Sequence, residues 1–409
     1  MKNQGSISRR GFLKGAAAAA GAVAGTRLAG SSMIGDARAA GAGAPAVLVI
    51  YTLGGYNSIF PSFDSLAGTS FGAGMTGKDL GNGLIVDPTF ANLNAYALSH
   101  MATIGTKAGQ SAHDSAEQAD WGDGTSNYML QLANAMGGTG SIKAAVAGGN
   151  MPQGPAPAVN GVSLQQINDL ASTISALSGT GDATVPDRGL ATKGITASQA
   201  MSKNRLTDSP RGLVTLGQGY QASIDTLTKP PKMFTLSDYT TAAAGYNLGN
   251  NTSVNSFKAQ MAAAELMIAA GTNVVCAMTG FNWDSHGDKD ASNVRNMMAN
   301  TIIPPLNTFI QNVMSDTGRN NSDDFGRRNV TVVIMGDFAR SLPGSDHQPN
   351  MSVTVFGNNV KVGTTGKTDA NVGLGPSTPG MKGLWAYLAA ASKVTASPFG
   401  ANPHGLTLA

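Results

Sequence analysis

Charged side chains are scarce in this chain of 409 residues: Asp, Glu, Lys and Arg together make up 12% of it, and aromatic residues make up 6%. Typical globular proteins contain about 25% charged residues, so Ser, Thr, Asn, Gln and Gly must supply much of the polar surface. Clusters of Lys and Arg with interleaved aromatic residues are also absent, which argues against a nucleic-acid-binding surface. This composition fits a periplasmic or secreted protein better than a cytosolic one.

Cysteine occurs once, at Cys276, so an internal disulfide is excluded and the core alone must hold the fold together. The segment 273–278, NVVCAM, is apolar and predicts a buried strand. A small apolar residue in a core strand is the ordinary role of a buried Cys, and this favours a structural Cys276 over a nucleophile.

The N-terminal residues have the pattern of a twin-arginine export signal. The motif SRRGFLK begins at Ser8, an Ala-rich run follows over 15–25, and Ala37, Arg38 and Ala39 supply a small-x-small cleavage pattern. The run is shorter than the roughly 20 apolar residues that a membrane span needs. We therefore expect residues 1–39 to be a signal peptide read by the twin-arginine export machinery. The mature chain, periplasmic or secreted, would keep no stable membrane span.

Removal of this signal reverses the sign of the net charge. The whole chain carries a formal charge of +3, but residues 1–39 hold six of its 27 Lys and Arg and one of its 24 Asp and Glu. Residues 40–409 therefore contain 21 basic and 23 acidic residues, a net charge of −2. The basic character belongs to the precursor.

Two apolar runs without alternation, 46–51 and 329–335, predict strands covered on both faces. A strong helix pattern over 256–270 leads directly into the Cys276 strand. Helices followed by strands are typical of a doubly wound α/β fold, with a mostly parallel sheet between helix layers. We expect one such domain over 40–409. Its Gly/Ala/Ser-rich part at about 137–251 is predicted to be an insertion or cap, with helices around 163–177 and 198–206.

Four of the five histidines lie in short polar clusters, at His113, His286, His347 and His404. Asp284 and His286 follow a predicted strand after a short loop, and ligands in open α/β sheets lie at the carboxyl ends of strands. With a second imidazole from His347 they would supply three protein ligands and leave one position open, as in catalytic zinc sites. An isolated Asp-x-His is also common as a turn with a hydrogen-bonded imidazole, so a structural role stays open.

The order of several motifs resembles the exported domain-of-unknown-function family 1501, which is placed in the alkaline phosphatase superfamily. These motifs are GGYNS at 54–58, His113 with Gln118 and Trp121, FNWDSHG at 281–287, GDFARS at 336–341 and GSDH at 344–347. The resemblance covers most of the mature chain and is weakest over 137–251. It implies an alkaline-phosphatase-like α/β sheet with a two-metal site that acts on phospho- or sulfo-esters.

Position by position, the resemblance implies one divalent ion, zinc or manganese, at Asp284, His286 and His347. A second ion would need an acidic residue after the first strand and an Asp-His pair after a late strand. This chain has Asn57 at the first place and Asp337 followed by Phe338 at the second, so the second site is weakened. His113 could substitute for the missing imidazole. An alternative alignment makes Asp346 and His347 the late pair and His404 the last ligand.

The superfamily nucleophile lies at a helix start, and Ser115 has that place here; an ordinary N-cap is the alternative. Arg340 could clamp an oxygen of a small anionic substrate, or pair with Asp337 to order the loop. Two hypotheses follow from these residues. One is a metal-dependent hydrolase of phospho- or sulfo-esters, and the other is a non-catalytic exported binding or assembly protein that keeps the fold.

Overall fold

A computed structural model describes residues 45–137, 142–149, 152, 158–159, 161–178, 188–205, 234–279, 283–315, 329–340 and 345–408. The predicted signal peptide and its cleavage site lie outside these residues. Among the described helices, none combines the length and the apolar character needed to cross a membrane.

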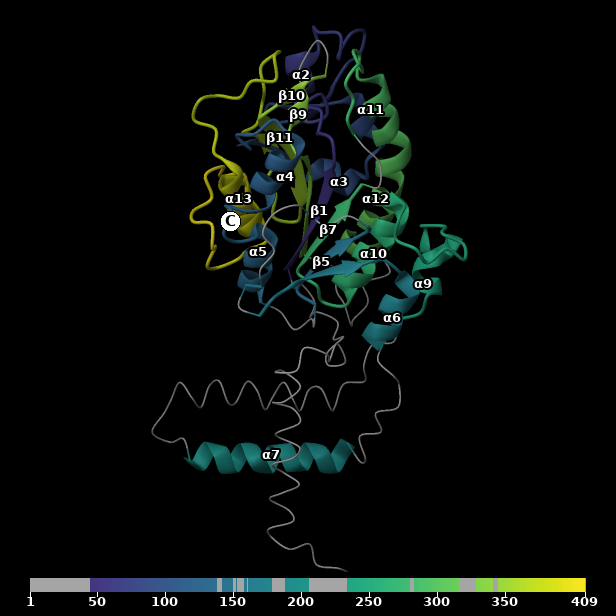
Figure 1. Ribbon diagram of the computed structural model, residues 1–409, viewed down its shortest axis with the longest axis vertical. Helices are drawn as coiled ribbons and strands as arrows, with labels where there is room; N and C mark the ends of the chain where they lie inside the picture. The colour runs from purple at the N-terminus through teal and green to yellow at the C-terminus, as the bar shows by residue number, and fades with distance from the viewer. Residues whose placement is uncertain are drawn as a thin grey trace, which may run out of the picture.

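The core of the fold is a sheet in which eight strands of the described chain are hydrogen-bonded (Figure 1). Seven of them run in one direction, and β11 is antiparallel to both of its neighbours, β4 and β8. This confirms the α/β class and the mostly parallel sheet. In spatial order the strands are β12 Gly363–Thr364, β4 Met101–Lys107, β11 Asn350–Gly357, β8 Asn329–Gly336, β1 Pro45–Thr52, β7 Val274–Met278, β5 Ala144–Ala147 and β6 Leu164–Ile167.

The central strands are β1, β7 and β8, as the apolar runs predicted. Val49 of β1 lies opposite Cys276 on one side and Val333 on the other, and all three residues are fully buried. Burial on both faces explains why these segments show no alternation of apolar and polar residues. Cys276 is a buried core residue, and burial raises the pKa of its thiol well above the usual value.

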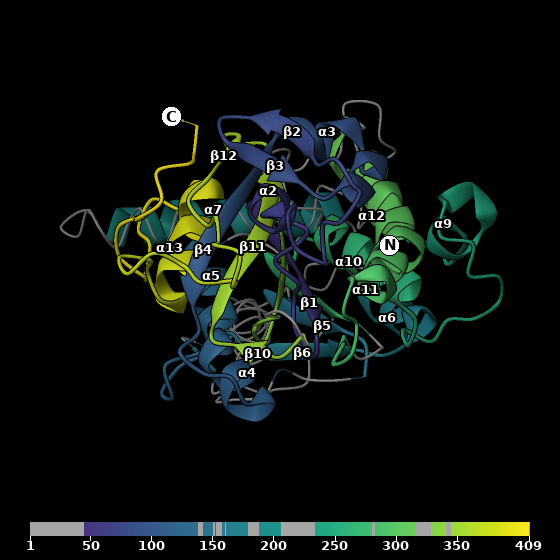
Figure 2. The ribbon, with the colours of Figure 1, turned by 90° about the horizontal axis from the view of Figure 1, so that it is seen from above.

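Helices cover both faces of the sheet, as Figures 1 and 2 show from two directions. One layer contains α4 His113–Trp121, α5 Tyr128–Met136 and α13 Met381–Ala391. The opposite layer contains α10 Phe257–Ala269 and a continuous helical segment made of α11 Ser292–Met297, the π-helical turns Met298–Ile302, α12 Ile303–Phe309 and the π-helical turns Ile310–Met314. The predicted helix over 256–270 is confirmed, and Oγ of Ser256 accepts from the N–H of Ala259 to cap it.

The Gly/Ala/Ser-rich segment differs from its prediction. Strands β5 and β6 belong to the central sheet, so this part of 137–251 is no separate cap. The predicted helix over 163–177 is wrong at its start, because 164–167 form β6. Helix α6 Leu170–Ser178 begins only after Asp169, whose carboxylate accepts from the N–H of Ser172. Helix α7 Arg188–Arg205 includes most of the predicted helix 198–206 but begins ten residues earlier.

Smaller elements complete the described chain. Two short strand pairs lie outside the main sheet: β2 Lys78–Gly81 with β3 Leu84–Val86, and β9 Ala339–Arg340 with β10 His347–Gln348. The short helices are α2 Phe63–Leu66, the 3-10 turn Pro88–Asn92, α3 Ala95–Ser99, α9 Ser237–Thr240 and the 3-10 turn Ala242–Ala244. The pair β9–β10 places the late histidine motif beside the end of β8.

Candidate metal centre

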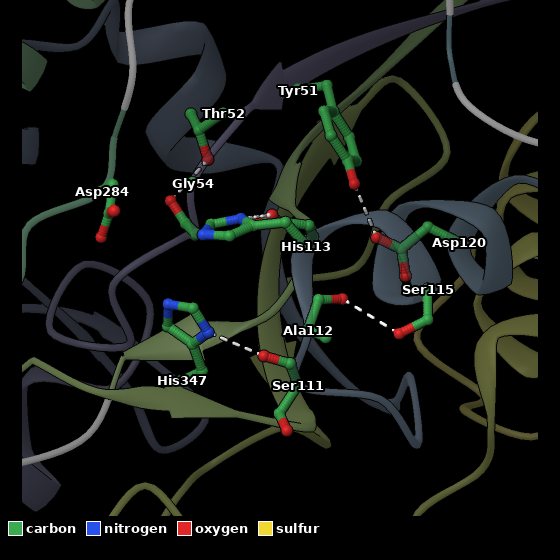
Figure 3. A network of polar contacts seen from close by, with 12 residues as sticks. Tyr51, Thr52, Gly54, Ser111, Ala112, His113, Ser115, Asp120, Asp284 and His347 are labelled. Carbon is green, nitrogen blue, oxygen red and sulfur yellow. Dashed lines mark hydrogen bonds and ion pairs between the residues drawn. The ribbon is translucent and has the colours of Figure 1, made fainter.

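Three segments that follow parallel strands meet at the carboxyl edge of the sheet. His113 begins α4 after β4, Asp284 follows β7, and His347 lies in β10 after β8. One ligand atom from each of these three residues lies within 4.8 Å of the others. Figure 3 shows the Nε2 atoms of His113 and His347 on the side where Asp284 lies. The predicted convergence of Asp284 and His347 is therefore present, and His113 joins them.

His286 connects two members of this group. Its Nε2 lies 2.9 Å from Nε2 of His347 and 3.4 Å from Oδ1 of Asp284. The other ring nitrogen of His286, Nδ1, lies 3.3 Å from a carboxylate oxygen of Asp346. The four residues His113, Asp284, His286 and His347 are called the metal centre below.

Hydrogen bonds at Nδ1 fix the tautomers of two of these histidines. Nδ1 of His347 lies 2.7 Å from the carbonyl oxygen of Ser111, and Nδ1 of His113 lies 2.6 Å from Oδ2 of Asp337. Because a carbonyl or carboxylate oxygen only accepts, the proton of each neutral ring must be on Nδ1. Each Nε2 then carries a lone pair, which is the form that binds a metal ion.

Burial also favours the neutral imidazole at His347. Loss of hydration lowers the pKa of this ring, the hydrogen bond to Ser111 opposes the effect, and the neighbouring Arg340 adds to it. The pKa therefore lies below the usual value for His. A ring that resists protonation keeps its Nε2 lone pair available at neutral pH.

Asp337 and Phe338 support the centre from behind. Asp337 is fully buried, and its Oδ2 lies 2.6 Å from Nδ1 of His113, so it holds this ring in place. Burial raises the pKa of Asp337, although the hydrogen bond and charge of His113 partly offset this effect. The Phe338 ring stacks on His347 with 4.0 Å between ring centroids, and it packs against His113 at 4.8 Å. The phenyl ring thus occupies the place of the expected second imidazole as a packing partner.

Arg340 is not placed as a clamp for a substrate anion. Its side chain is 1% exposed and donates to Oδ1 of Asp284 at 2.8 Å, to the carbonyl of Ser345 at 2.9 Å and to the carbonyl of Gly54. The guanidinium therefore joins the ends of three loops. The expected alternative, a direct hydrogen bond from Arg340 to Asp337, is replaced by the pair with Asp284.

Ser115 does not join the centre. Its Oγ donates to the carbonyl of Ala112 at 3.2 Å, and in Figure 3 it lies on the far side of Ala112 from His347. Helix geometry explains this position, since a residue two places after His113 is rotated by about 200° around the axis. The N-cap residue of α4 is Ala112, so Ser115 is not the N-cap either.

The side chains of Asn57 and His404 make their contacts outside the metal centre. Oδ1 of Asn57 accepts from the N–H of Ile59 at 3.0 Å, which makes it the cap of a local turn. Nδ1 of His404 lies 2.8 Å from Oγ1 of Thr365, and its ring meets Tyr387 edge-on. The alternative alignment with His404 as the last ligand is therefore wrong, whereas its other member, Asp346, contacts His286.

The donor set and its spacing suit a divalent ion. Zinc binds imidazole nitrogen at about 2.0–2.1 Å in a tetrahedral arrangement, so two of its ligand atoms lie about 3.3 Å apart. Nε2 of His286 lies 2.9 Å from Nε2 of His347 and 3.4 Å from Oδ1 of Asp284, which is close to this spacing. The ligand atoms of His113, Asp284 and His347 lie within 4.8 Å of one another, so a bound ion would draw them closer together. Three imidazoles and one carboxylate are ligands that zinc accepts and that manganese also tolerates.

The sequence argument considered Asp346 only as a member of the alternative late pair, and in the structure it contacts His286. One further supporting contact was missed. The contact of His347 with Ser111 uses a backbone carbonyl, which leaves no side-chain signal. Such a contact depends only on where the chain before α4 runs.

Residues 187–378 match the model of a family described as a protein of unknown function (DUF1501). This match supports the assignment to that family. The matched range includes Asp284, His286 and His347, whereas His113 lies before it. A search of the curated proteins gave no match.

Proposed function

We propose that this chain is an exported metal-binding protein of alkaline-phosphatase-like fold, with one divalent ion at His113, Asp284, His286 and His347. The activity class proposed for it is hydrolysis of phospho- or sulfo-esters. Export rests on the twin-arginine motif at Arg9 and Arg10, and the superfamily rests on the motif order.

The contact between His286 and His347 carries the metal proposal. Nε2 of His347 has a lone pair because its Nδ1 proton is held by Ser111, and it faces Nε2 of His286 at 2.9 Å. Two facing lone pairs at this distance repel each other unless a cation lies between them, whereas a proton on Nε2 of His286 makes the contact an ordinary hydrogen bond. The carboxylate of Asp346, 3.3 Å from Nδ1 of His286, favours the tautomer that has its proton on Nδ1 and its lone pair on Nε2. A divalent ion satisfies both nitrogens together with the nearby carboxylate of Asp284.

The residues around the centre would each have a defined task. Asp337 holds His113 in its ligating tautomer, and Arg340 fixes the carboxylate of Asp284. A bound zinc or manganese ion would polarise an ester oxygen or lower the pKa of a coordinated water. The half-exposed side chain of His286 leaves this side of the centre accessible to a small anionic substrate.

The second candidate is a non-catalytic binding or assembly protein that keeps one ion for structure. Three observations favour it over the hydrolase: Asn57 caps a turn, Phe338 packs on His347, and Arg340 donates to Asp284, Gly54 and Ser345. The second metal site and the anion clamp of an ester hydrolase are then missing from their expected positions. Both candidate functions include the metal centre, but only the hydrolase would turn over an ester substrate.

Elemental analysis of the purified mature protein tests the shared claim, beside Asp284→Ala, His347→Ala and the control Gln118→Ala. Gln118 is exposed on α4 and lies outside the centre. We expect about one ion per chain in the wild type and the control, and a loss of at least tenfold in affinity in both centre variants. If the wild type contains no metal, so that His286 and His347 share a proton instead, the proposal of a metal site is refuted. Release of phosphate or sulfate from aryl esters then separates the two candidates.

A further inference from the structure

Behind the metal centre, the inner face of α4 carries two buried carboxyl groups. His113, Glu117 and Asp120 are spaced by four and seven residues, so they lie on one face of the helix. Glu117 is 3% exposed and Asp120 is fully buried. Asp337, which holds His113, is a third buried carboxyl group beside this face.

Asp120 has the surroundings of a protonated acid. Its Oδ2 accepts from the hydroxyl of Tyr51 at 2.9 Å, while its Oδ1 is buried without a hydrogen-bond partner. No Lys or Arg of the described chain forms an ion pair with it. An ionised carboxylate in such a place loses its hydration without compensation, and a proton on the free oxygen removes that cost.

The groups that face Asp120 come from several elements. Tyr51 of β1 donates to it, Glu117 lies on its own helix, Asp337 follows β8, and Trp385 of α13 donates to its backbone carbonyl. Burial raises the pKa of Asp120 well above its usual value, the Tyr51 hydrogen bond opposes this, and the charges of Asp337 and Glu117 raise it further. Burial and the charge of Asp120 likewise raise the pKa of Tyr51, which therefore stays a donor.

We propose that Asp120 is a neutral carboxylic acid in the metal-free protein and that it releases its proton to the solvent buffer when a divalent ion occupies the metal centre. The first half stands on the burial of Asp120 and on its unpartnered Oδ1, and the second half rests on the proposed function. The O–H bond of the acid breaks, the electron pair stays on the carboxylate, and the Tyr51 hydroxyl stabilises the charge that forms.

The distance between the two sites makes this coupling large enough to measure. Asp120 follows His113 by seven residues, which corresponds to about 10 Å along the helix axis. At an effective dielectric constant of about 20, a divalent charge at that separation raises the acid dissociation constant of Asp120 by about two powers of ten. Asp120 would thus act as a charge-compensating residue outside the ligand set.

Infrared spectroscopy of the metal-free protein tests the first half. At pH 8 ordinary Asp and Glu are ionised, so a protonated carboxyl band must come from a perturbed group. We expect this band in the wild type and in Gln118→Ala, and its loss in Asp120→Asn, which keeps an acceptor for Tyr51. A band of undiminished intensity in Asp120→Asn, or no band in the wild type, would overturn the assignment.

Proton counting on metal loading tests the second half. Calorimetric titration with zinc in two buffers of different ionisation enthalpy should show about one proton more released by the wild type than by Asp120→Asn. Protons from the histidines and from metal-bound water cancel in this comparison. Equal counts would refute the coupling. A wild type that binds no ion would instead refute the proposed function and with it this second half, while the infrared result would still decide the first.

A wild-type measurement covers the case in which Asp120→Asn does not fold. The spectrum of the zinc-loaded protein minus that of the metal-free protein should show loss of the carboxylic acid band and gain of a carboxylate band. An unchanged acid band after full loading would overturn the proposal.

Discussion

Arg340 and Asp284 form an ion pair with 2.8 Å between Nη2 and Oδ1, in which the guanidinium is buried and the carboxylate is partly exposed. The same guanidinium donates to the carbonyls of Gly54 and Ser345. Burial raises the pKa of Asp284, but the charges of Arg340 and His286 outweigh burial and hold the pKa below its usual value. Asp284 therefore stays an ionised ligand with a fixed orientation.

Arg340→Lys tests this fixing role. A Lys ammonium keeps the charge but cannot reach three acceptors in the planar geometry of a guanidinium. We expect the free energy of unfolding to fall by about 2 kcal/mol, since at least one buried acceptor loses its donor. Zinc affinity should fall by about tenfold or more, because Asp284 is no longer oriented. Denaturant unfolding and metal titration of the same samples measure both effects; unchanged affinity would mean that Asp284 orients itself.

Asp337→Asn tests whether Asp337 is an orienting group or a ligand. The amide keeps the size of the side chain and can accept from Nδ1 of His113, but it is a weaker acceptor. We expect zinc affinity to fall by about 10- to 100-fold with about one ion still bound at saturation. The free energy of unfolding should stay the same or rise, because a buried carboxyl group is replaced by a neutral amide. X-ray absorption of the zinc-loaded variant would show an unchanged number of ligands; loss of one oxygen ligand would identify Asp337 as a ligand.

The ligands at strand ends could be predicted from the sequence, because parallel strands deliver their carboxyl ends to one edge. Asp284 and His286 follow the apolar run that forms β7, and His347 follows the run that forms β8; these two strands flank β1. This local signal was sufficient to expect that the three residues meet. His113 was expected only as a substitute. Its place depends on β4, which the apolar pattern did not indicate.

The roles of Asp337 and Ser115 could not be predicted, for a geometric reason. Both depend on how α4 is rotated against the sheet, and a short helix with polar residues on several sides does not reveal its buried face. The strand β6 was missed because LQQI at 164–167 fits a helix or a strand equally well. Its identity is decided by pairing with β5, a contact that is not local in sequence.

Because the His404 ring is buried, we expect the protein to lose stability in mild acid, independently of the metal centre. Burial lowers the pKa of this ring to about 4, from about 6.5 when unfolded. The unfolded chain therefore binds a proton first, so the contribution of His404 to stability is complete above about pH 6.5 and is lost as the pH falls through about 4.

The variant His404→Gln removes this titration and keeps a polar group near Thr365. Between pH 7 and pH 4.5 the wild type should lose up to about 2.5 kcal/mol more stability than the variant. Denaturant unfolding at the two pH values, with the protein metal-free in both cases, measures the difference. Equal losses in the two proteins would show that His404 is not the group that titrates.

Ser115→Ala separates attack by a serine from attack by water at the proposed centre. The Oγ of Ser115 donates to the carbonyl of Ala112, so its removal should change the free energy of unfolding by no more than about 0.5 kcal/mol. Metal content should be unchanged, because Ser115 contacts none of the four ligands in the described structure. If the wild type hydrolyses 4-nitrophenyl phosphate or sulfate, we expect the variant to keep turnover within about twofold, whereas His347→Ala should lose it. A metal-loaded variant without turnover would make Ser115 the nucleophile and would require the start of α4 to rotate when substrate binds.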